Sequence, residues 1–306
     1  MPYSARWFLG VILAGCGAIG AHAQSPDSPS PSRATTAEHG LVPDQSRDAV
    51  SPQDNGYKDG PWKSFSDVTK EAEVRTGMFT LYLKREKAYL SLTPAQLDRD
   101  YLLVTQLSRG IGELGLDGGS SIRSDLVRFH RAGDRIELQI VNPRFAATPG
   151  SPMERTVEYS FGNSVAQSFS IATMRDNGEI LVDVAPFLLS DWADLGAFFQ
   201  GVATQRKLSG TITLDRDRSA MEQIRVFPGN FEAGVRLTYQ ANRNLGLETV
   251  SDYRWIPVGV HYSLLELPTV PMRPRYADER VGYFISAIKD FSRDTAESFF
   301  VRYVNR

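Results

Sequence analysis

Residues 126–141 read Leu-Val-Arg-Phe-His-Arg-Ala-Gly-Asp-Arg-Ile-Glu-Leu-Gln-Ile-Val. Apolar and polar residues alternate on both sides of the turn Ala132-Gly133-Asp134, which is the period-two pattern of strands with one buried face. A glycine in a short turn between two such runs is typical of an antiparallel hairpin. This stretch therefore predicts two paired strands, and it sets the pattern for the rest of the chain.

The same rhythm recurs along the chain. We expect a hairpin of 77–83 and 88–92 around the charged tip Lys84–Lys87, and further strands at 101–107, 156–161, 168–174, 179–184, 208–214, 224–227, 235–239 and 255–264. Helical signals are fewer: a short capped helix within 59–73, one turn at Thr93-Pro94, and helices at 185–200 and 280–290. Strands that follow one another in runs predict an α+β, β-rich fold of mostly antiparallel strands and hairpins with a few short helices, and argue against a doubly wound fold.

The composition disfavours several function classes. The 306 residues carry 34 Lys and Arg against 36 Asp and Glu, a formal net charge of -2, so we expect no nucleic-acid partner. The single cysteine excludes a disulfide framework, a cysteine zinc cluster and a C-x-x-C redox pair.

The N-terminus predicts export. Residues 1–23 combine an early arginine, an apolar run and the cleavage pattern Ala21-His22-Ala23, as in a secretory signal peptide. Residues 13–16, Leu-Ala-Gly-Cys, also resemble a lipobox in which Cys16 would be acylated, so two processing fates stay open. The mature protein would be periplasmic, outer-membrane-anchored or extracellular, with membrane contact only through a lipid anchor.

Composition also divides the remaining chain. Residues 24–55 are rich in Ser and Pro and lack aromatic residues, which predicts a disordered spacer. We expect a small N-terminal subdomain at 56–100 and a β-rich domain at 101–306.

Recognisable catalytic or metal-binding motifs are absent from the sequence. Gly110-Ile-Gly112-Glu-Leu-Gly115 matches G-x-G-x-x-G, but no helix signal follows the third glycine, so we expect a glycine loop rather than a nucleotide site. His130 and His261 both fall on expected strands. We expect them to be surface or hydrogen-bonded core residues rather than ligands of a zinc site completed by a carboxylate. Asp215-Arg-Asp-Arg-Ser219 predicts a solvated ion-pair turn. Paired glycosidase-type acids cannot be assigned from the sequence.

The segment from Asp252 to Phe284 is the most distinctive. It contains Asp252-x-Arg254, Val258-Gly-Val-His-Tyr-Ser-Leu264 and Met272-Arg-Pro-Arg-Tyr-Ala-Asp-Glu-Arg-Val-Gly-Tyr-Phe284. Arginines surround acidic residues here, and prolines stiffen the backbone, which favours internal carboxylate pairing over pairing with a partner.

These motifs resemble the N-terminal, unknown-function region of large secreted bacterial zinc-dependent metalloproteases. The resemblance implies that the zinc-binding H-E-x-x-H helix lies downstream, so zinc is expected only in a downstream domain and no cofactor in this chain. It supplies no catalytic residue, and we expect the chain to be the front part of a longer protein. The signature residues that it marks, with a structural role expected, are Arg254, His261, Met272, Arg273, Arg275, Asp278, Arg280 and Gly282.

The leading functional hypothesis is an exported, non-catalytic accessory region of a zinc metalloprotease-like protein, inactive alone. It would act in folding, substrate docking or regulation, with a metalloprotease catalytic domain in cis or trans as partner and a peptide as substrate. The alternative is a free-standing envelope module that binds a peptide or a glycan. An independent enzyme with carboxylates that the sequence does not reveal is a third hypothesis.

Overall fold

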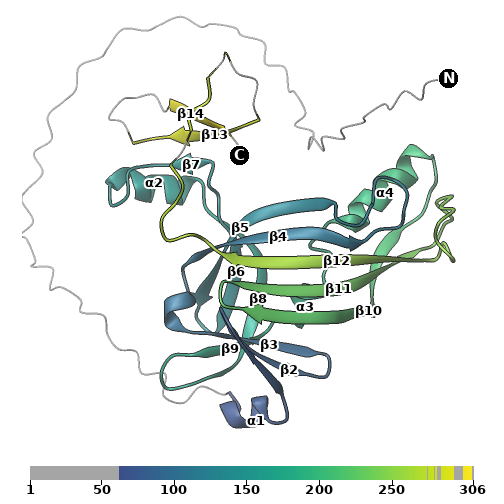
Figure 1. Cartoon of the computed structure of the whole chain (residues 1–306), viewed down its shortest axis with the longest axis horizontal. Helices are drawn as coiled ribbons and strands as arrows, with labels where there is room; N and C mark the ends of the chain where they lie inside the picture. Colours follow the sequence, from purple (N-terminus) through teal and green to yellow (C-terminus); the bar gives the residue numbers. More distant parts are fainter. Residues whose placement is uncertain (1–61, 274, 279, 281–283, 293–298, 305–306) are drawn as a thin grey trace, which may run out of the picture. The chain divides into compact units, whose positions relative to one another are not determined.

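The fold is built on one large antiparallel sheet. The computed structural model describes residues 62–273, 275–278, 280, 284–292 and 299–304. Eleven strands pair in the order β1-β2-β3-β9-β8-β6-β5-β4-β12-β11-β10 (Figure 1). Their bounds are β1 Glu73–Thr76, β2 Thr80–Lys84, β3 Lys87–Leu92, β4 Asp100–Arg109, β5 Ser121–Ala132, β6 Arg135–Ile140, β8 Ser164–Met174, β9 Ile180–Asp183, β10 Ile212–Phe227, β11 Asn230–Ala241 and β12 Trp255–Glu266. The expected β-rich, mostly antiparallel fold is confirmed.

The β5–β6 hairpin lies near the middle of this sheet, as the sequence predicts. Val127 pairs with Ile140 and Arg131 with Ile136, and Gly133 has a φ of 61° in the connecting turn. The inward positions, such as Phe129 and Ile136, are buried, because alternate residues of a strand face the same side. The predicted β2–β3 hairpin is confirmed in the same way.

The two ends of the sheet approach each other, so that it nearly closes into a barrel. Between β1 and β10, the N–H of Met78 donates to the carbonyl of Phe227 at 2.7 Å, and the Arg75 guanidinium donates to the carbonyl of Ile224. Gly77 permits this approach, since a Cβ there would lie 2.7 Å from the Phe227 carbonyl oxygen. The contact is local, and β10 extends well beyond it.

Strand β10 merges the two strands expected at 208–214 and 224–227. The intervening Asp215–Ser219 segment bulges from the register, and Arg218 donates to the Asp215 carboxylate at 2.7 Å. The ion pair expected there is confirmed, but the solvated turn is wrong, because the segment lies within the strand and the Asp215 side chain is mostly buried. Bulges and charges of this kind discourage the edge of a sheet from pairing with another chain. This edge is therefore protected rather than open for strand addition.

The helices are short. Their bounds are α1 Phe65–Thr69, the 3-10 turn η1 Pro94–Gln96, α2 Pro152–Ser160, α3 Ala185–Leu188 and α4 Leu195–Gln205. The expectation of a single helix over 185–200 is wrong. The chain breaks after α3, where Asp194 adopts a left-handed φ of 56° and the Asp191 side chain accepts from the first amide of α4. The described part of the chain has no helix long and apolar enough to span a membrane.

Two further expectations are wrong. Residues 156–161 lie mostly in helix α2 rather than in a strand, because Ser151 caps the N–H of Glu154 and Pro152 starts the helix. Residues 285–290 of the expected helix 280–290 form strand β13 instead, since backbone pairing with neighbouring strands overrides a weak helical pattern. The second sheet has the order β14-β13-β7, with bounds β7 Phe145–Ala146, β13 Ile285–Asp290 and β14 Phe299–Val304.

The division into subdomains at residue 100 stays a prediction. Strands β1 to β3 join the large sheet through the pairing of β3 with β9. The expected signal peptide at 1–23, the lipobox at 13–16 with Cys16, and the spacer at 24–55 lie outside the described residues.

Candidate ligand-binding site at the barrel mouth

Polar side chains line one end of the near-barrel. Along β5 the inward positions change from the buried Phe129 and Val127 to Asp125 and Arg123. Along β8 the inward row passes from the buried Phe169 to Gln167. Because alternate residues share a face, these polar groups point to the same side as the core. We call this end the mouth.

A pocket of about 400 Å³ opens at the mouth. Strands β5 and β8 form one side of it, and the connection between α3 and α4 forms the other. The lining residues are Arg123, Ala166, Gln167, Phe187, Ser190, Asp191, Trp192 and Asp194. This combination of two aromatic rings with several charged and amide groups is typical of a site for a polar ligand.

Arg123 is held rigidly in this mouth pocket. Its Nε and Nη2 donate to the two oxygens of Asp125 at 2.6 and 2.9 Å, and its Nη1 donates to the carbonyl of Trp192 at 3.2 Å. The guanidinium lies 4.1 Å from the centre of the Trp192 ring. The bidentate pair neutralises the arginine, and the guanidinium covers one face of the indole.

Trp192 is fixed from two further sides. Its indole N–H donates to Thr105 Oγ1 at 3.1 Å, and Thr105 is itself fully buried on β4. The Phe187 ring packs against it, with centroids 5.3 Å apart. The indole is therefore a structural wall of the pocket.

Asp191 joins the α3–α4 connection to the barrel wall. Its carboxylate accepts from the N–H groups of Leu195 and Gly196 at 3.0 and 2.9 Å, and from the hydroxyl of Tyr239 at 2.5 Å. Burial, and then the hydrogen bond to Asp191, raise the pKa of Tyr239. Gly196 leaves room for this contact, since a Cβ there would lie 2.7 Å from Asp191 Oδ2.

Asp194 supplies the second carboxylate of the pocket. Its backbone carbonyl accepts the N–H of Phe198, but its side chain caps no helix amide and forms no ion pair with a described residue. Since Asp125 neutralises Arg123, the charges left in the pocket are those of Asp191 and Asp194. The pocket is thus net negative and suits a cationic group.

The signature residues lie elsewhere. Arg254 forms a bidentate ion pair with Asp252, and this contact lowers the pKa of Asp252 to about 2. His261 Nε2 lies 2.6 Å from Glu232 Oε2. His130 lies 2.6 Å from Asp98, so the two histidines have separate carboxylate partners. No cluster of three metal-ligating side chains occurs among the residues that the structure describes.

The later signature residues are exposed. Arg280 pairs with Asp278 at 2.5 Å, which is the internal pairing that we expected, and Met272, Arg273 and Arg275 are exposed as well. Gly282 lies outside the described residues. None of the described signature residues lines the mouth pocket, and their structural role stays a prediction.

Sequence reasoning missed the residues that form the pocket, namely Arg123, Gln167, Asp191, Trp192 and Asp194. One signal was available in the sequence. Arg123 and Asp125 alternate with other residues in the same way as the buried Val127, so they face the same side of the sheet, close to the end of the strand. The other residues come together only through the break between α3 and α4.

The glycine loop is held by hydrogen bonds. The N–H of Ile111 donates to the carbonyl of Leu116 at 3.0 Å, and Glu113 accepts from Thr249. A Cβ at Gly110 would lie 1.7 Å from the Leu116 carbonyl oxygen, so glycine is required for this close approach. Strand β5, rather than a helix, follows the loop, and the loop therefore lacks the helix N-terminus of a dinucleotide site.

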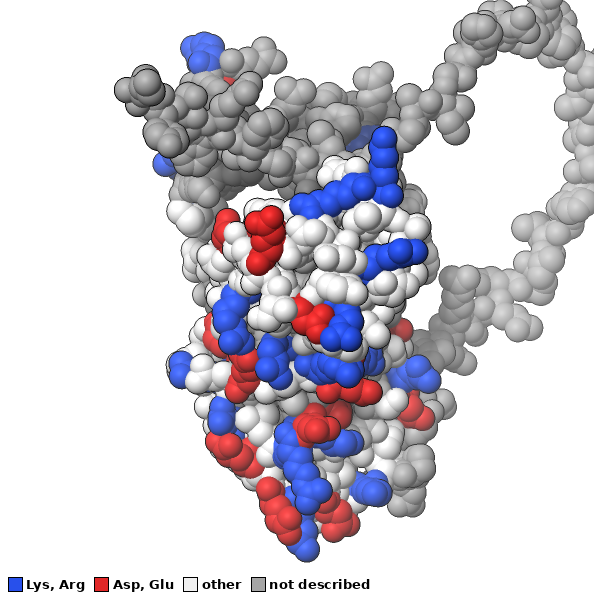
Figure 2. Space-filling view, turned by 90° about the vertical axis from the view of Figure 1, so that its right-hand side faces the viewer, with Lys and Arg blue, Asp and Glu red and all other residues white. Residues whose placement is uncertain are grey.

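The surface carries charges of both signs. On the face drawn in Figure 2, Lys and Arg side chains are interspersed with Asp and Glu side chains. This face has no single-sign field that would favour a polyanion.

Two family models match the chain. The family described as a domain of unknown function (DUF5117) matches residues 119–306, which is more than half of the chain, and a second domain of unknown function (DUF5118) matches residues 62–110. The two regions meet in the loop between β4 and β5, whose strands are neighbours in one sheet. No curated protein and no solved structure matches the chain.

Proposed function

Because this chain belongs to the DUF5117 family, whose description names no activity, we propose a function from the geometry of the mouth pocket. The protein binds polypeptide segments and holds a lysine or arginine side chain in this pocket. The observation that carries the proposal is the net negative pocket, in which Asp191 and Asp194 remain after Asp125 neutralises Arg123.

A peptide fits the pocket better than a glycan. Sugars bind aromatic side chains through an open ring face, and the Arg123 guanidinium covers one face of Trp192 while Phe187 packs against the ring. A lysine or arginine side chain can instead form charge-assisted hydrogen bonds with the carboxylates at the mouth, and neighbouring peptide groups can hydrogen-bond to the amide of Gln167.

The test is calorimetric titration with three ten-residue peptides that differ at one position, Lys, norleucine or Glu. We expect the Lys peptide to bind about tenfold more tightly than the norleucine peptide, and this preference to shrink at high salt. Asp194→Asn should reduce the preference severalfold, whereas the exposed Asp217→Asn on β10 serves as the control and should leave it unchanged. Equal binding of the three peptides, or an Asp194→Asn variant that behaves as wild type, would overturn the proposal.

We further propose that this binding docks substrates for a zinc metalloprotease domain, in cis or in trans. The support is the resemblance of the segment 252–284, together with four large apolar side chains of that segment that are more than two-thirds exposed. They are Val270, Met272, Tyr276 and Phe284. Exposed apolar residues grouped in one segment are typical of a protein contact surface.

Two measurements test this assignment separately from peptide binding. The coding DNA downstream of Arg306, or an adjoining reading frame, should encode H-E-x-x-H, and its absence would contradict the protease association. The chain alone should not hydrolyse casein with added zinc. Mass spectrometry of the mature protein tests export, since either a free Gln24 or an acylated Cys16 is expected at its N-terminus.

A further inference from the structure

A second pocket lies between the two edge strands of the large sheet. The hydrogen bond from Met78 to Phe227 joins the end of β1 to β10, and a pocket of about 390 Å³ lies further along the two strands, with the β2–β3 hairpin tip on one side. We call it the seam pocket. Its volume is within the range of small-molecule sites, and none of the described residues lines both this pocket and the mouth pocket. The lining residues are Glu73, Arg75, Leu83, Lys84, Arg85, Lys87, Met221, Glu222, Gln223 and Ile224.

The lining of the seam pocket is positively charged. It contains four basic residues against two acidic ones, a formal net charge of +2. Glu73 pairs with Arg75 at 2.8 Å, so these two charges cancel. Glu222 pairs at 2.5 Å with Arg109, which does not line the pocket, so this carboxylate does not neutralise the remaining lining cations. Those cations all belong to the hairpin tip Lys84–Lys87.

Two of the three tip cations lack an internal partner. Within the part of the chain that the structure describes, the side chains of Lys84 and Arg85 form no hydrogen bond or ion pair. Lys87 Nζ lies 3.8 Å from Asp183, which is a long contact beside the other ion pairs of the protein. The tip therefore keeps positive charge that an external anion can neutralise.

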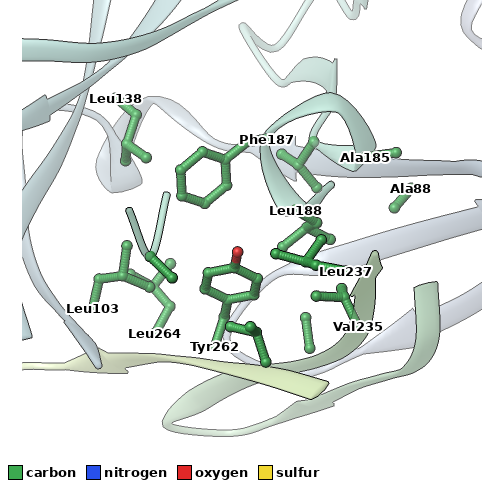
Figure 3. Packing of buried hydrophobic residues seen from close by; sticks show 14 of the residues in the cluster. Ala88, Leu103, Leu138, Ala185, Phe187, Leu188, Val235, Leu237, Tyr262 and Leu264 are labelled. Atoms are coloured by element: carbon green, nitrogen blue, oxygen red, sulfur yellow. The ribbon is translucent and has the colours of Figure 1, made fainter. Parts of the chain in front are cut away.

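The composition of the tip costs stability. Lys84 and Lys87 lie directly opposite each other in the β2–β3 register, where like charges are destabilising. Arg85 has a φ of 51°, a left-handed conformation that favours glycine. The base of the hairpin is firm, because Ala88 is 0% exposed and belongs, with Ala185 of α3, to the buried cluster drawn in Figure 3. Unfavourable residues on a firm base are typical of a functional turn rather than of one that serves the fold.

The opposite wall of the seam pocket adds a neutral donor. With its amide oxygen toward Arg225, Gln223 accepts from Nε and Nη2 of that guanidinium at 3.1 and 2.6 Å, which leaves its NH2 group for another acceptor. A phosphate monoester carries a charge of about −1.5 to −2 at pH 7 and three strong acceptor oxygens. Its charge matches the net +2 of the lining, whereas a single carboxylate would leave one positive charge unmatched.

We propose that the seam pocket binds a phosphate monoester group, which Lys84, Arg85 and Lys87 hold from the hairpin tip and Gln223 from β10. This site is independent of the proposed peptide site, because the mouth pocket is net negative and repels phosphate. The phosphate group is carried either by a free small molecule or by a lipid headgroup, and the chemistry of recognition is the same for both.

The first test compares two carriers of the phosphate. Calorimetry measures glucose 6-phosphate against glucose, and flotation measures phosphatidylcholine vesicles with and without phosphatidic acid. Binding of glucose 6-phosphate but not of glucose supports a free phosphate compound, and binding only of vesicles that contain phosphatidic acid supports a lipid. Lys84→Gln/Arg85→Gln should weaken the binding at least about tenfold, whereas Lys207→Gln/Arg216→Gln removes the same charges outside the pocket and should leave it unchanged. Binding of neither phosphate probe, or an equal loss in both double variants, would overturn the proposal.

The second test separates a ligand-binding role of the tip from a structural one. Arg85→Gly removes a cation of the pocket and places glycine at the left-handed position. We expect its melting temperature to rise by about 2–4 °C and its affinity for the phosphate probe to fall severalfold. An Arg85→Gly variant that binds the phosphate probe as tightly as wild type, or that melts below wild type, would contradict the proposal.

Discussion

Replacing Asp191 by alanine should destabilise the protein, because one carboxylate at the mouth serves three donors. The substitution removes the acceptor for the amides of Leu195 and Gly196 and for the Tyr239 hydroxyl. Loss of the helix cap costs about 1 kcal/mol, and an unsatisfied hydroxyl on the fully buried Tyr239 costs about 1–3 kcal/mol. We therefore expect the free energy of unfolding to fall by about 2–4 kcal/mol.

Urea denaturation followed by circular dichroism measures this loss, and a double-mutant cycle locates it. Tyr239→Phe removes the donor, so the loss in Asp191→Ala/Tyr239→Phe should be smaller than the sum of the single losses by about 1–2 kcal/mol. Asp217→Ala on the exposed bulge of β10 should stay within about 0.5 kcal/mol of wild type. The reasoning is refuted if Asp191→Ala matches this control, or if the two effects at Asp191 and Tyr239 simply add.

Three further predictions concern backbone space, charge and pH. Gly196→Ala places a methyl group against the Asp191 carboxylate and should lower the urea midpoint. Gly201→Ala lies in open space on the same helix and should raise the free energy of unfolding by about 0.5–1 kcal/mol. Arg254→Ala should raise the pKa of Asp252 from about 2 toward 3.8, as followed by carboxyl NMR; an unchanged value would mean that the ion pair does not form in solution. Burial raises the pKa of Tyr262, so the folded protein resists ionisation of this hydroxyl more than the unfolded chain does. The free energy of unfolding is therefore unaffected by this group below pH 10 and falls above it, by about 1.4 kcal/mol per pH unit. Urea midpoints between pH 9 and 11 should therefore fall less steeply in Tyr262→Phe than in wild type, and parallel slopes would contradict this origin.

The hairpins of the fold could be predicted because local and tertiary preferences agree there. In residues 126–141 the alternation, the turn and the burial all favour the same pairing. Residues 156–161 misled the prediction, since their β-favouring composition suggests a strand while the cap Ser151 and Pro152, which precede them, start a helix. Boundary signals outside a segment outweighed the propensity within it.

The candidate site was beyond sequence reasoning for a different reason. Its carboxylates and Trp192 lie on an irregular connection, where no periodicity indicates direction, and their neighbours Thr105 and Tyr239 come from distant strands. They come together only when the α3–α4 connection packs against β4 and β11 in the folded protein. The polar side chains of Arg123 and Asp125 could have indicated that this end of the strand lines a polar mouth. They could not have indicated that the α3–α4 connection lies opposite them.

The most direct test of the proposed function is an NMR titration that follows the indole N–H resonance of Trp192. Its hydrogen bond to Thr105 gives this proton a fixed environment within the mouth pocket. Addition of the Lys peptide should shift the resonance in a saturable way, and Asp194→Asn should weaken the binding curve severalfold. A Trp192 resonance that does not move, while resonances of the exposed residues 268–273 do, would contradict peptide binding at the mouth.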